Sequence, residues 1–572
     1  MSDEPSFLGS LRNSLAQPNS GKTKTGAASF WDFLADQESV NEKPLNLLPA
    51  QKEAFDENSF FWAMRNLPVT EATKHFLICG CSGSGKTVTI RLFLQSIAPR
   101  FQQNWKKNEQ LILFDAKNDA NDVLKAMGID PAAPHVWILN PVDPNSAVWN
   151  IAETVQSPTM ARHFATLLVP EERNSNTPYF ADGARELVYA VLLGFIAVAG
   201  LKWTLRDLLC ALESQDRIKA VASQDPRAQI LVARILEDDR HSAGILSTLG
   251  TKLGRFEQVA ALWHAQGAKA ARSFCIRKFL EHPGVLVLGN DPVLRDSFWP
   301  ITAMLLKALT QEILREPETL EPRHWFVLDE FRAMERVQCI HDLLNLGRSK
   351  GASVLIGLQS IDGLLELYGQ NGANDLLTQC ASKTFLRAGG PATAKWAETF
   401  FGTVRTKEIV VTESSQGFTT NTSKQHTIAE RAVLIASYFM NLPLPRRGGD
   451  YTAVCDVPCL ERFFIVNRPF DEVLSWRWKA PKSVDSPSHR RGPSPADEIL
   501  KPWTDAETAS FCTKQSNGPN KVSQFASPPP TQPISKLSAP SQDNPSQPSA
   551  RKVMEDRWTS QAIPPDSTAP QT

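Results

Sequence analysis

The feature that most constrains this chain is a glycine-rich loop between a predicted strand and a predicted helix. Residues 80–87, Gly80-Cys81-Ser82-Gly83-Ser84-Gly85-Lys86-Thr87, fit the phosphate-binding pattern G-x-x-x-x-G-K-[ST] at every specified position. An apolar run at residues 75–79 precedes this phosphate loop, and residues 88–94 follow it with the apolar spacing of a buried helix. In this strand–loop–helix context the pattern indicates a nucleoside triphosphate site, whereas a chance glycine-rich turn is the bland alternative.

The phosphate loop has the residue types that this chemistry needs. Glycines let backbone N–H groups turn toward a triphosphate, and the helix N-terminus adds a positive partial charge. Lys86 is expected to reach the β- and γ-phosphates of ATP, and the Thr87 hydroxyl is expected to bind Mg²⁺. The predicted nucleotide-binding residues are Gly80, Ser82, Gly83, Ser84, Gly85, Lys86 and Thr87.

Length and charge limit the remaining possibilities. A chain of 572 residues is too long for one compact core. Lys+Arg and Asp+Glu number 61 each, so a nucleic-acid surface must be local or assembled by oligomerisation. The nine cysteines form no CxxC pair, which favours reduced thiols in a cytosolic protein over a zinc site.

One segment resembles a membrane span. Leu187–Leu201 is apolar over about 15 residues, short of the ~20 that a bilayer requires, and Arg185, Glu186 and Lys202 bracket it. The N-terminus is polar and has no signal peptide. We therefore predict a buried core helix in a soluble, cytoplasmic protein without an intrinsic membrane span.

Short apolar runs alternate with helical patterns, which predicts an α/β fold with a mostly parallel sheet. The predicted strands are Leu111–Asp115, Val136–Leu139, Val285–Leu288, Trp325–Leu328, Ser353–Ile356 and Ala381–Leu386, besides the run before the phosphate loop. Between them, residues 155–270 have helical spacing and predict an all-helical insertion. The nucleotide-binding domain is then expected in two parts, 46–154 and 271–480.

Both ends of the chain lack the pattern of a packed core. Residues 1–45 are predicted to be a flexible tail, and residues 481–572 a disordered tail rich in Pro and Ser. Such a tail could also dock a partner through short extended motifs. Its aromatic anchors are Lys501-Pro502-Trp503 and Asp556-Arg557-Trp558.

A second motif supplies two acids. The strand at Trp325–Leu328 ends in Asp329 and Glu330. Asp329 is predicted to hold Mg²⁺ through its water shell, and Glu330 to orient and deprotonate the attacking water. Many strands end in acids, so the pair gains its meaning from the phosphate loop that precedes it in the chain.

Three further polar residues are candidates with bland alternatives. Gln359 ends the next strand and could contact the γ-phosphate or its water; the alternative is a surface amide. Arg348 could neutralise transition-state charge at its own site or at a neighbour's; the alternative is a surface salt bridge or a DNA-phosphate contact. Asp115 is expected to be structural. The predicted catalytic residues are Glu330, Gln359 and Arg348.

These motifs resemble, in order and spacing from about 70 to 470, the conjugative coupling proteins of type IV secretion systems. This TraD/TraG-like group is related to the FtsK and HerA translocases among RecA-like P-loop ATPases. The matching strings are residues 75–87, Leu113–Lys117, Leu139–Pro141, Trp149-Asn150, Tyr179–Ala181, Gly183–Arg185, Leu328–Phe331, Gly347–Gly351, Leu358–Ser360 and Leu367–Gly369.

The resemblance implies a homo-hexameric motor that uses ATP and Mg²⁺. It would receive a relaxase within a relaxosome and move single- or double-stranded DNA toward the channel components of a secretion system. The motif match assigns Lys86 and Thr87 to phosphate and magnesium, Asp329 and Glu330 to the acidic pair, Gln359 to the sensor position and Arg348 to the arginine finger.

The chain departs from the family pattern in two places. No membrane-spanning helix precedes the phosphate loop, so either a separate subunit recruits the protein to the inner face of the cell membrane or the chain belongs to a soluble branch. Asp115-Ala116-Lys117-Asn118 also lacks the proline and glycine usual there.

Two other functions are compatible with the same core. One is a soluble FtsK/HerA-like DNA translocase or packaging ATPase, and the other is a nucleotide-switched cargo adaptor, against which Glu330 argues. A basic run supports DNA binding, with an ordinary solvated surface as the alternative. It comprises Lys269, Arg272, Arg277 and Lys278.

Overall fold

The computed structural model describes residues 56–143, 145–171, 178–269, 271–416, 419–460, 463–476 and 494–513. The predicted tail at 1–45 and the predicted anchor at 556–558 lie outside the described residues.

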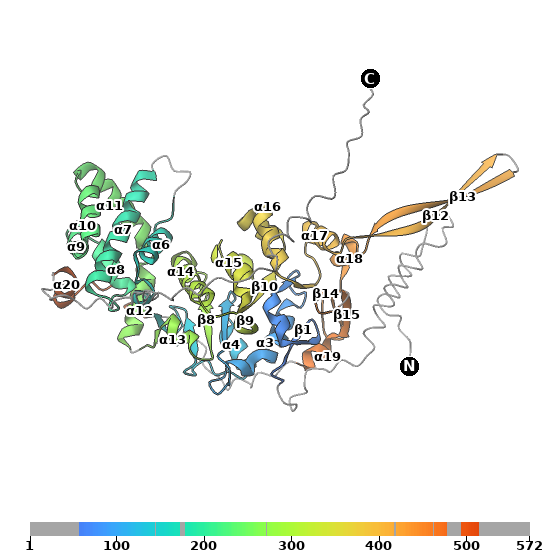
Figure 1. Ribbon diagram of the computed structural model, residues 1–572, viewed down its shortest axis with the longest axis horizontal. Helices are drawn as coiled ribbons and strands as arrows, with labels where there is room; N and C mark the ends of the chain where they lie inside the picture. Colours follow the sequence, from blue (N-terminus) through green and yellow to red (C-terminus); the bar gives the residue numbers. More distant parts are fainter. Residues whose placement is uncertain are drawn as a thin grey trace, which may run out of the picture. The chain divides into compact units, whose positions relative to one another are not determined.

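A nine-stranded sheet forms the centre of the fold (Figure 1), in the order β15-β14-β11-β3-β10-β9-β4-β8-β5. All strands from β5 to β11 in this order run parallel, whereas β14 and β15 pair antiparallel at one edge. The strands are β3 (Phe76–Cys79), β4 (Gln110–Asp115), β5 (Val136–Leu139), β8 (Gly284–Gly289), β9 (Thr319–Leu328), β10 (Lys350–Leu358), β11 (Ser382–Phe385), β14 (Asp450–Asp456) and β15 (Phe464–Pro469). The predicted mostly parallel sheet and each of its predicted strands are confirmed, but the antiparallel edge was not predicted.

The sheet is buried on both faces, which explains its continuous apolar strands. Alternate residues of β3 enter different cores: Phe76 and Ile78 pack on the side of helices α3 (Lys86–Ile97) and α4 (Ala120–Ala126), and Leu77 and Cys79 pack on the other. That other side also holds α14 (Arg295–Leu314), α15 (Cys339–Leu346) and α16 (Asp362–Gln379).

The region predicted as an all-helical insertion is helical. Its helices are α6 (Pro158–Leu168), α7 (Pro178–Val198), α8 (Leu205–Leu212), α9 (Gln215–Ala222), α10 (Pro226–Ile235), α11 (Asp239–Gly254) and α12 (Glu257–Ala268). The short strands β6 (Val148–Trp149) and β7 (Ser273–Phe274) pair where the chain enters and leaves this region.

Helix α7 is the core of the helical region, because α6 and α8 to α11 all pack against it. Most of its residues between Leu187 and Phe195 are buried, which confirms the predicted core helix. Within the part of the chain that the structure describes, no helix has the length and apolarity to span a membrane.

Smaller elements complete the described fold. The strands β12 (Thr403–Gln416) and β13 (Thr419–Ala432) form a hairpin, and β1 (Ser59–Trp62) pairs with β2 (Arg65–Pro68). The remaining helices are α5 (Ile151–Thr154), α13 (Ile276–Leu280), α17 (Pro391–Phe401), α18 (Ala436–Asn441), α19 (Phe470–Ser475) and α20 (Asp505–Cys512).

One part of the predicted C-terminal tail needs correction. Residues 494–513 are described, and they bury Trp503 and, within helix α20, Phe511 against the helical region. The composition of the segment 481–572 was typical of disorder, but this short part packs two aromatic side chains and makes polar contacts with the helical region.

Candidate nucleotide-binding site

The phosphate loop connects β3 to α3, and backbone hydrogen bonds to the ends of the two strands beside β3 hold it in place. The Gly80 N–H donates to the Leu358 carbonyl at the end of β10 (3.1 Å), and the Cys81 N–H donates to the Arg387 carbonyl after β11 (2.8 Å). The loop therefore emerges at the carboxyl edge of the parallel strands, where ligands bind in open α/β sheets.

Glycine is required in this loop by conformation and by space. Gly83 and Gly85 have φ values of +76° and +103°, which side-chain-bearing residues rarely adopt. A Cβ atom on Gly80 would lie 2.5 Å from Ser84 Oγ, and one on Gly85 would lie 2.9 Å from the ring of Tyr451.

Tyr451 supports the phosphate loop from β14. It is fully buried, and its hydroxyl lies 2.7 Å from Thr89 Oγ1 in the first turns of α3. Burial raises the pKa of this phenol, so it stays protonated. Sequence reasoning missed Tyr451, because its strand lies more than three hundred residues farther along the chain and has no motif.

Lys86 is folded back onto the loop. Its Nζ donates to the Gly80 carbonyl at 2.6 Å, and the side chain is buried. Burial lowers the pKa of Lys86, whereas the charges of Glu330 and Asp329 act in the opposite direction. The ammonium therefore lies within the field of Asp329 and Glu330.

The predicted magnesium ligands Thr87 and Asp329 lie on the two sides of a third residue, Lys117. The Lys117 Nζ lies 2.7 Å from Asp329 Oδ2 and 3.3 Å from Thr87 Oγ1. These residues line part of a hollow, open to solvent, between α3 and the ends of β4 and β9.

This arrangement fits a magnesium ion. Asp329 Oδ1 and Ser84 Oγ are buried and have no hydrogen-bond partner among the described residues. Carboxylates and hydroxyls are oxygen ligands of the kind that Mg²⁺ prefers, and the Lys117 ammonium already lies between the Asp329 carboxylate and the Thr87 hydroxyl. Gly357 keeps the space open, since a Cβ there would lie 2.9 Å from Asp329 Oδ1.

Glu330 and Gln359 are brought together by adjacent strands. Strands β9 and β10 are paired so that Ile356 lies opposite Leu328, and the two polar residues follow the strand ends. The Gln359 amide Nε2 donates to Glu330 Oε2. Glu330 has a φ of +61°, a strained conformation for a residue other than glycine that is frequent at functional sites.

Asp115 holds the loop that carries Lys117. Its two carboxylate oxygens accept from the N–H groups of Asp119 (2.9 Å) and Ala120 (3.1 Å). Burial raises its pKa. In the sequence, Lys117 was noted only as the last residue of the family-like stretch Leu113–Lys117. Its position two residues after the strand-terminal Asp115 could have indicated that it lies at this site.

The structure does not bring Arg348 to this site. Arg348 precedes β10 in the short 3₁₀ turn Gly347–Ser349, whereas Gln359 follows β10 at its other end. At about 3.3 Å per residue, the strand separates the two by roughly 30 Å. Arg348 lies near the buried His75 at the opposite edge of the sheet, so a role at its own chain's phosphates is excluded.

Two residues of the predicted basic run are engaged within the chain. Lys269 pairs with Asp497 at 2.8 Å, and Arg272 donates to the carbonyls of Pro134 and Val136 while packing on Trp137. For these two, a structural role is the better interpretation.

All nine cysteines are free. Across the described parts of the chain, no group of three or more His, Cys, Asp or Glu side chains could hold a metal.

Comparison with known proteins gives a family match over most of the chain. Residues 62–461 match the model of the type IV secretion-system coupling protein DNA-binding domain. The chain is 20% identical over 341 residues to the coupling protein TraD of Escherichia coli (strain K12), covering 58% of this chain and 44% of that protein. It is 22% identical over 292 residues to the coupling protein VirD4 of Bartonella henselae, covering 48% of this chain and 44% of that protein. The match thus spans less than half of each relative.

Solved structures share the fold. An unbound form of the bacterial conjugative coupling protein TrwB superimposes with a TM-score of 0.54 at 19% identity, covering 74% of this chain and 91% of that one. The same protein in complex with ADP and Mg²⁺ has a TM-score of 0.52 at 19% identity, covering the same shares. These likenesses confirm the predicted RecA-like P-loop fold.

Proposed function

Because this chain belongs to the family of type IV secretion-system coupling proteins, we propose that it is an ATP-driven DNA-transfer ATPase. It would link a relaxosome to a secretion channel. One observation carries the proposal: the phosphate loop, the acids Asp329 and Glu330, and Gln359 lie together at one edge of the sheet.

The residues divide the chemistry of hydrolysis among them. Loop N–H groups and Lys86 bind the triphosphate, once Lys86 exchanges the Gly80 carbonyl for phosphate oxygens. Thr87 and Asp329 would hold a magnesium ion, and that ion would neutralise phosphate charge when bound. Glu330 accepts the proton of the attacking water, and Gln359 fixes the Glu330 carboxylate.

The same contacts offer a route from hydrolysis to movement. Gln359 follows β10, and the Leu358 carbonyl before it accepts from the phosphate loop. A change at the γ-phosphate therefore acts directly on the segment that leads from β10 to α16. In a homo-hexamer, this movement would act on DNA in a central channel, and relaxase and channel components would be its protein partners.

A DNA-dependent ATPase assay tests the proposal. We expect ATP hydrolysis to rise with DNA length and to fall with salt, because phosphate contacts release counterions. Glu330→Gln should bind ATP and hydrolyse it at least ~100-fold more slowly, and Lys86→Ala should lose ATP binding. A confirmed hexamer without DNA stimulation would contradict DNA transfer, whereas normal ATP affinity in Lys86→Ala would contradict the site itself.

A further inference from the structure

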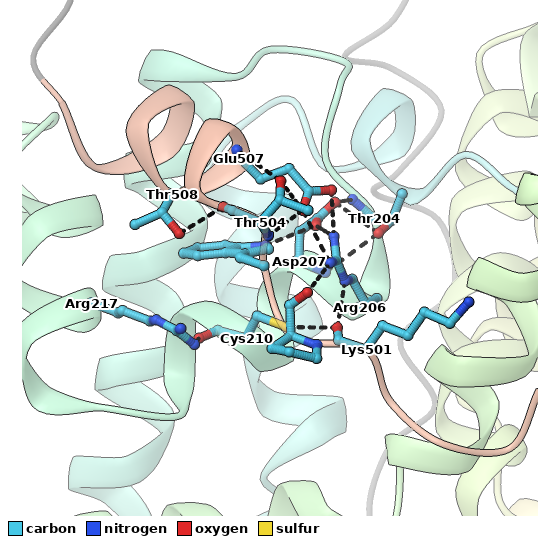
Figure 2. Close-up of polar contacts among 11 residues, drawn as sticks. Thr204, Arg206, Asp207, Cys210, Arg217, Lys501, Thr504, Glu507 and Thr508 are labelled. Atoms are coloured by element: carbon cyan, nitrogen blue, oxygen red, sulfur yellow. Dashed lines mark hydrogen bonds and ion pairs between the residues drawn. The ribbon is translucent and has the colours of Figure 1, made fainter. Parts of the chain in front are cut away.

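A segment near the C-terminal end of the described chain is held by one arginine of the helical region (Figure 2). The Arg206 guanidinium, on α8, donates to the backbone carbonyls of Lys501 (2.8 Å) and Pro502 (2.5 Å). It also pairs with both carboxylate oxygens of Glu507, at 2.7 and 3.1 Å. Such bidentate contacts have strict geometry, so Arg206 fixes both the path and the direction of this segment.

An aromatic anchor completes the contact. The Trp503 indole N–H donates to Asp207 Oδ1 at 2.9 Å, and its ring forms one aromatic cluster with Phe195 of α7 and Phe511 of α20. The Arg217 guanidinium of α9 lies over the same ring at 5.4 Å. Trp503 is only 6% exposed, which makes it the largest apolar contribution to this contact.

The docked segment organises its own shape. Thr504 and Glu507 form a reciprocal capping box that starts α20. The pairing with Arg206 holds the pKa of Glu507 down at about 2, so the carboxylate is charged at neutral pH. The groups that contact Arg206 and Asp207 therefore all lie in the first turn of α20 and the few residues before it. A short peptide that contains Trp503, Thr504 and Glu507 includes them.

Without the segment, the surface that it covers has polar and apolar groups that lack partners. Without the segment, Arg206 keeps only the Asp207 carboxylate among these partners, and an indole-sized apolar area beside Phe195 is exposed. Backbone carbonyl contacts, one aromatic anchor and one charged pair are the elements by which proteins recognise short peptides.

The segment is also tethered, which gives it the character of an intramolecular ligand. In the sequence, residues 477–493 separate it from Trp476, whose ring packs against Phe61. A ligand that is covalently joined to its site binds intramolecularly, so its occupancy does not depend on the protein concentration. A modest intrinsic affinity would thus be enough to keep the surface occupied.

We propose that the surface formed by Phe195, Arg206, Asp207 and Arg217 is a peptide-binding site and that residues 501–512 are its resident, exchangeable ligand. The site recognises a tryptophan followed directly by an N-capped helical turn with glutamate at its third position. A separate peptide of this chemistry binds only after displacing the chain's own segment.

Peptide binding to the full-length chain tests this directly. The probe is a fluorescent peptide of residues 499–513, and the readout is fluorescence anisotropy. Because Trp503→Ala weakens the tethered ligand and leaves the site intact, this variant should bind the probe with a Kd at least ~10-fold lower than wild type does. A chain with both Trp503→Ala and Arg206→Ala should bind the probe with a Kd at least ~10-fold higher than that of the Trp503→Ala chain.

Matched peptides serve as controls. A probe with Trp503→Ala should not bind, whereas a probe with Lys501→Ala should bind normally, because only the Lys501 carbonyl is recognised and its side chain is exposed. If Trp503→Ala impairs folding, as judged by helicity and melting temperature, a Glu507→Gln chain replaces it and should bind the probe about fivefold more tightly than wild type.

Two results would overturn the proposal. A folded Trp503→Ala chain that fails to bind the probe would mean that the segment is a fixed part of the fold. Equal affinity of the probe for wild type and Trp503→Ala would mean that the probe binds a surface that residues 501–512 do not occupy.

Discussion

Lys117 places its ammonium 2.7 Å from the Asp329 carboxylate, between this acid and the Thr87 hydroxyl. Its positive charge therefore lies beside the two predicted magnesium ligands. A divalent cation that binds there must displace Lys117, because like charges at this distance repel. The displaced ammonium would remain within the field of the phosphate loop, since it already acts on Lys86.

This competition predicts how magnesium dependence changes in Lys117→Met. The magnesium concentration for half-maximal ADP binding should fall about two- to fivefold, in line with the strength of a partly exposed ion pair. A fluorescent ADP analogue titrated with Mg²⁺ measures this. Lys107→Met is the matched control, because it removes an exposed ion pair with Glu321. Unchanged magnesium dependence in Lys117→Met would contradict the competition.

Gln359 should act on hydrolysis and not on binding. Gln359→Ala frees the Glu330 carboxylate and should lower kcat about 100-fold while leaving the Kd for ATP within twofold of wild type. Gln359→Glu places two carboxylates side by side, which hold a shared proton more tightly. The acidic limb of the pH profile of kcat should then move to higher pH. If Gln359 had only a structural role, Gln359→Glu would leave that limb unchanged.

Arg348 can be tested by mixing chains. Arg348→Ala should keep wild-type ATP affinity, since roughly 30 Å of strand separates it from its own phosphate loop. If Arg348 acts on a neighbouring subunit of an oligomer, mixing Arg348→Ala with Glu330→Gln should restore hydrolysis at the mixed interfaces. Inactive mixed assemblies would leave Arg348 with its alternative role as a surface or DNA-contacting residue.

Much of this site was predictable because its motifs are local. The phosphate loop and the Asp329–Glu330 pair each follow a short apolar strand, and parallel strands bring their carboxyl ends to one edge. The pairing of β9 with β10 then places Gln359 beside Glu330. The same reasoning misplaced Arg348, because residues 348 and 359 are close in sequence but lie at opposite ends of one strand.

Other features depend on contacts that no local pattern reveals. Tyr451 reaches α3 from β14, the strand next to the edge strand β15, and Trp503 reaches Phe195 from a segment whose composition indicated disorder. In both cases a single aromatic side chain makes the decisive contact. Its partner lies about three hundred or more residues away in the sequence, so periodicity and composition contain no signal for it.

Stability against acid provides a last test, centred on His75. This histidine is 1% exposed; its Nδ1 accepts from the Val354 N–H (3.2 Å) and its Nε2 donates to the Leu344 carbonyl (3.0 Å). The neutral ring is thus fully bonded, and a second proton would face the Val354 N–H. Burial lowers the pKa of His75 to about 4.

The unfolded chain, with a histidine pKa of about 6.5, therefore binds more protons than the folded one between pH 6.5 and 4. Stability should fall as the pH decreases through this window, by up to ~2 kcal/mol from His75 between pH 6.5 and 5. His163, whose pKa is also lowered to about 4, contributes with the same sign. Urea denaturation at pH 7.5, 6.5 and 5.5 measures this effect. At pH 7.5, His75→Gln should have a lower free energy of unfolding than wild type. Between pH 7.5 and 5.5, however, its free energy of unfolding should fall only about half as much as that of wild type. The exposed His282→Gln should follow wild type, and a His75→Gln chain as acid-sensitive as wild type would contradict this account.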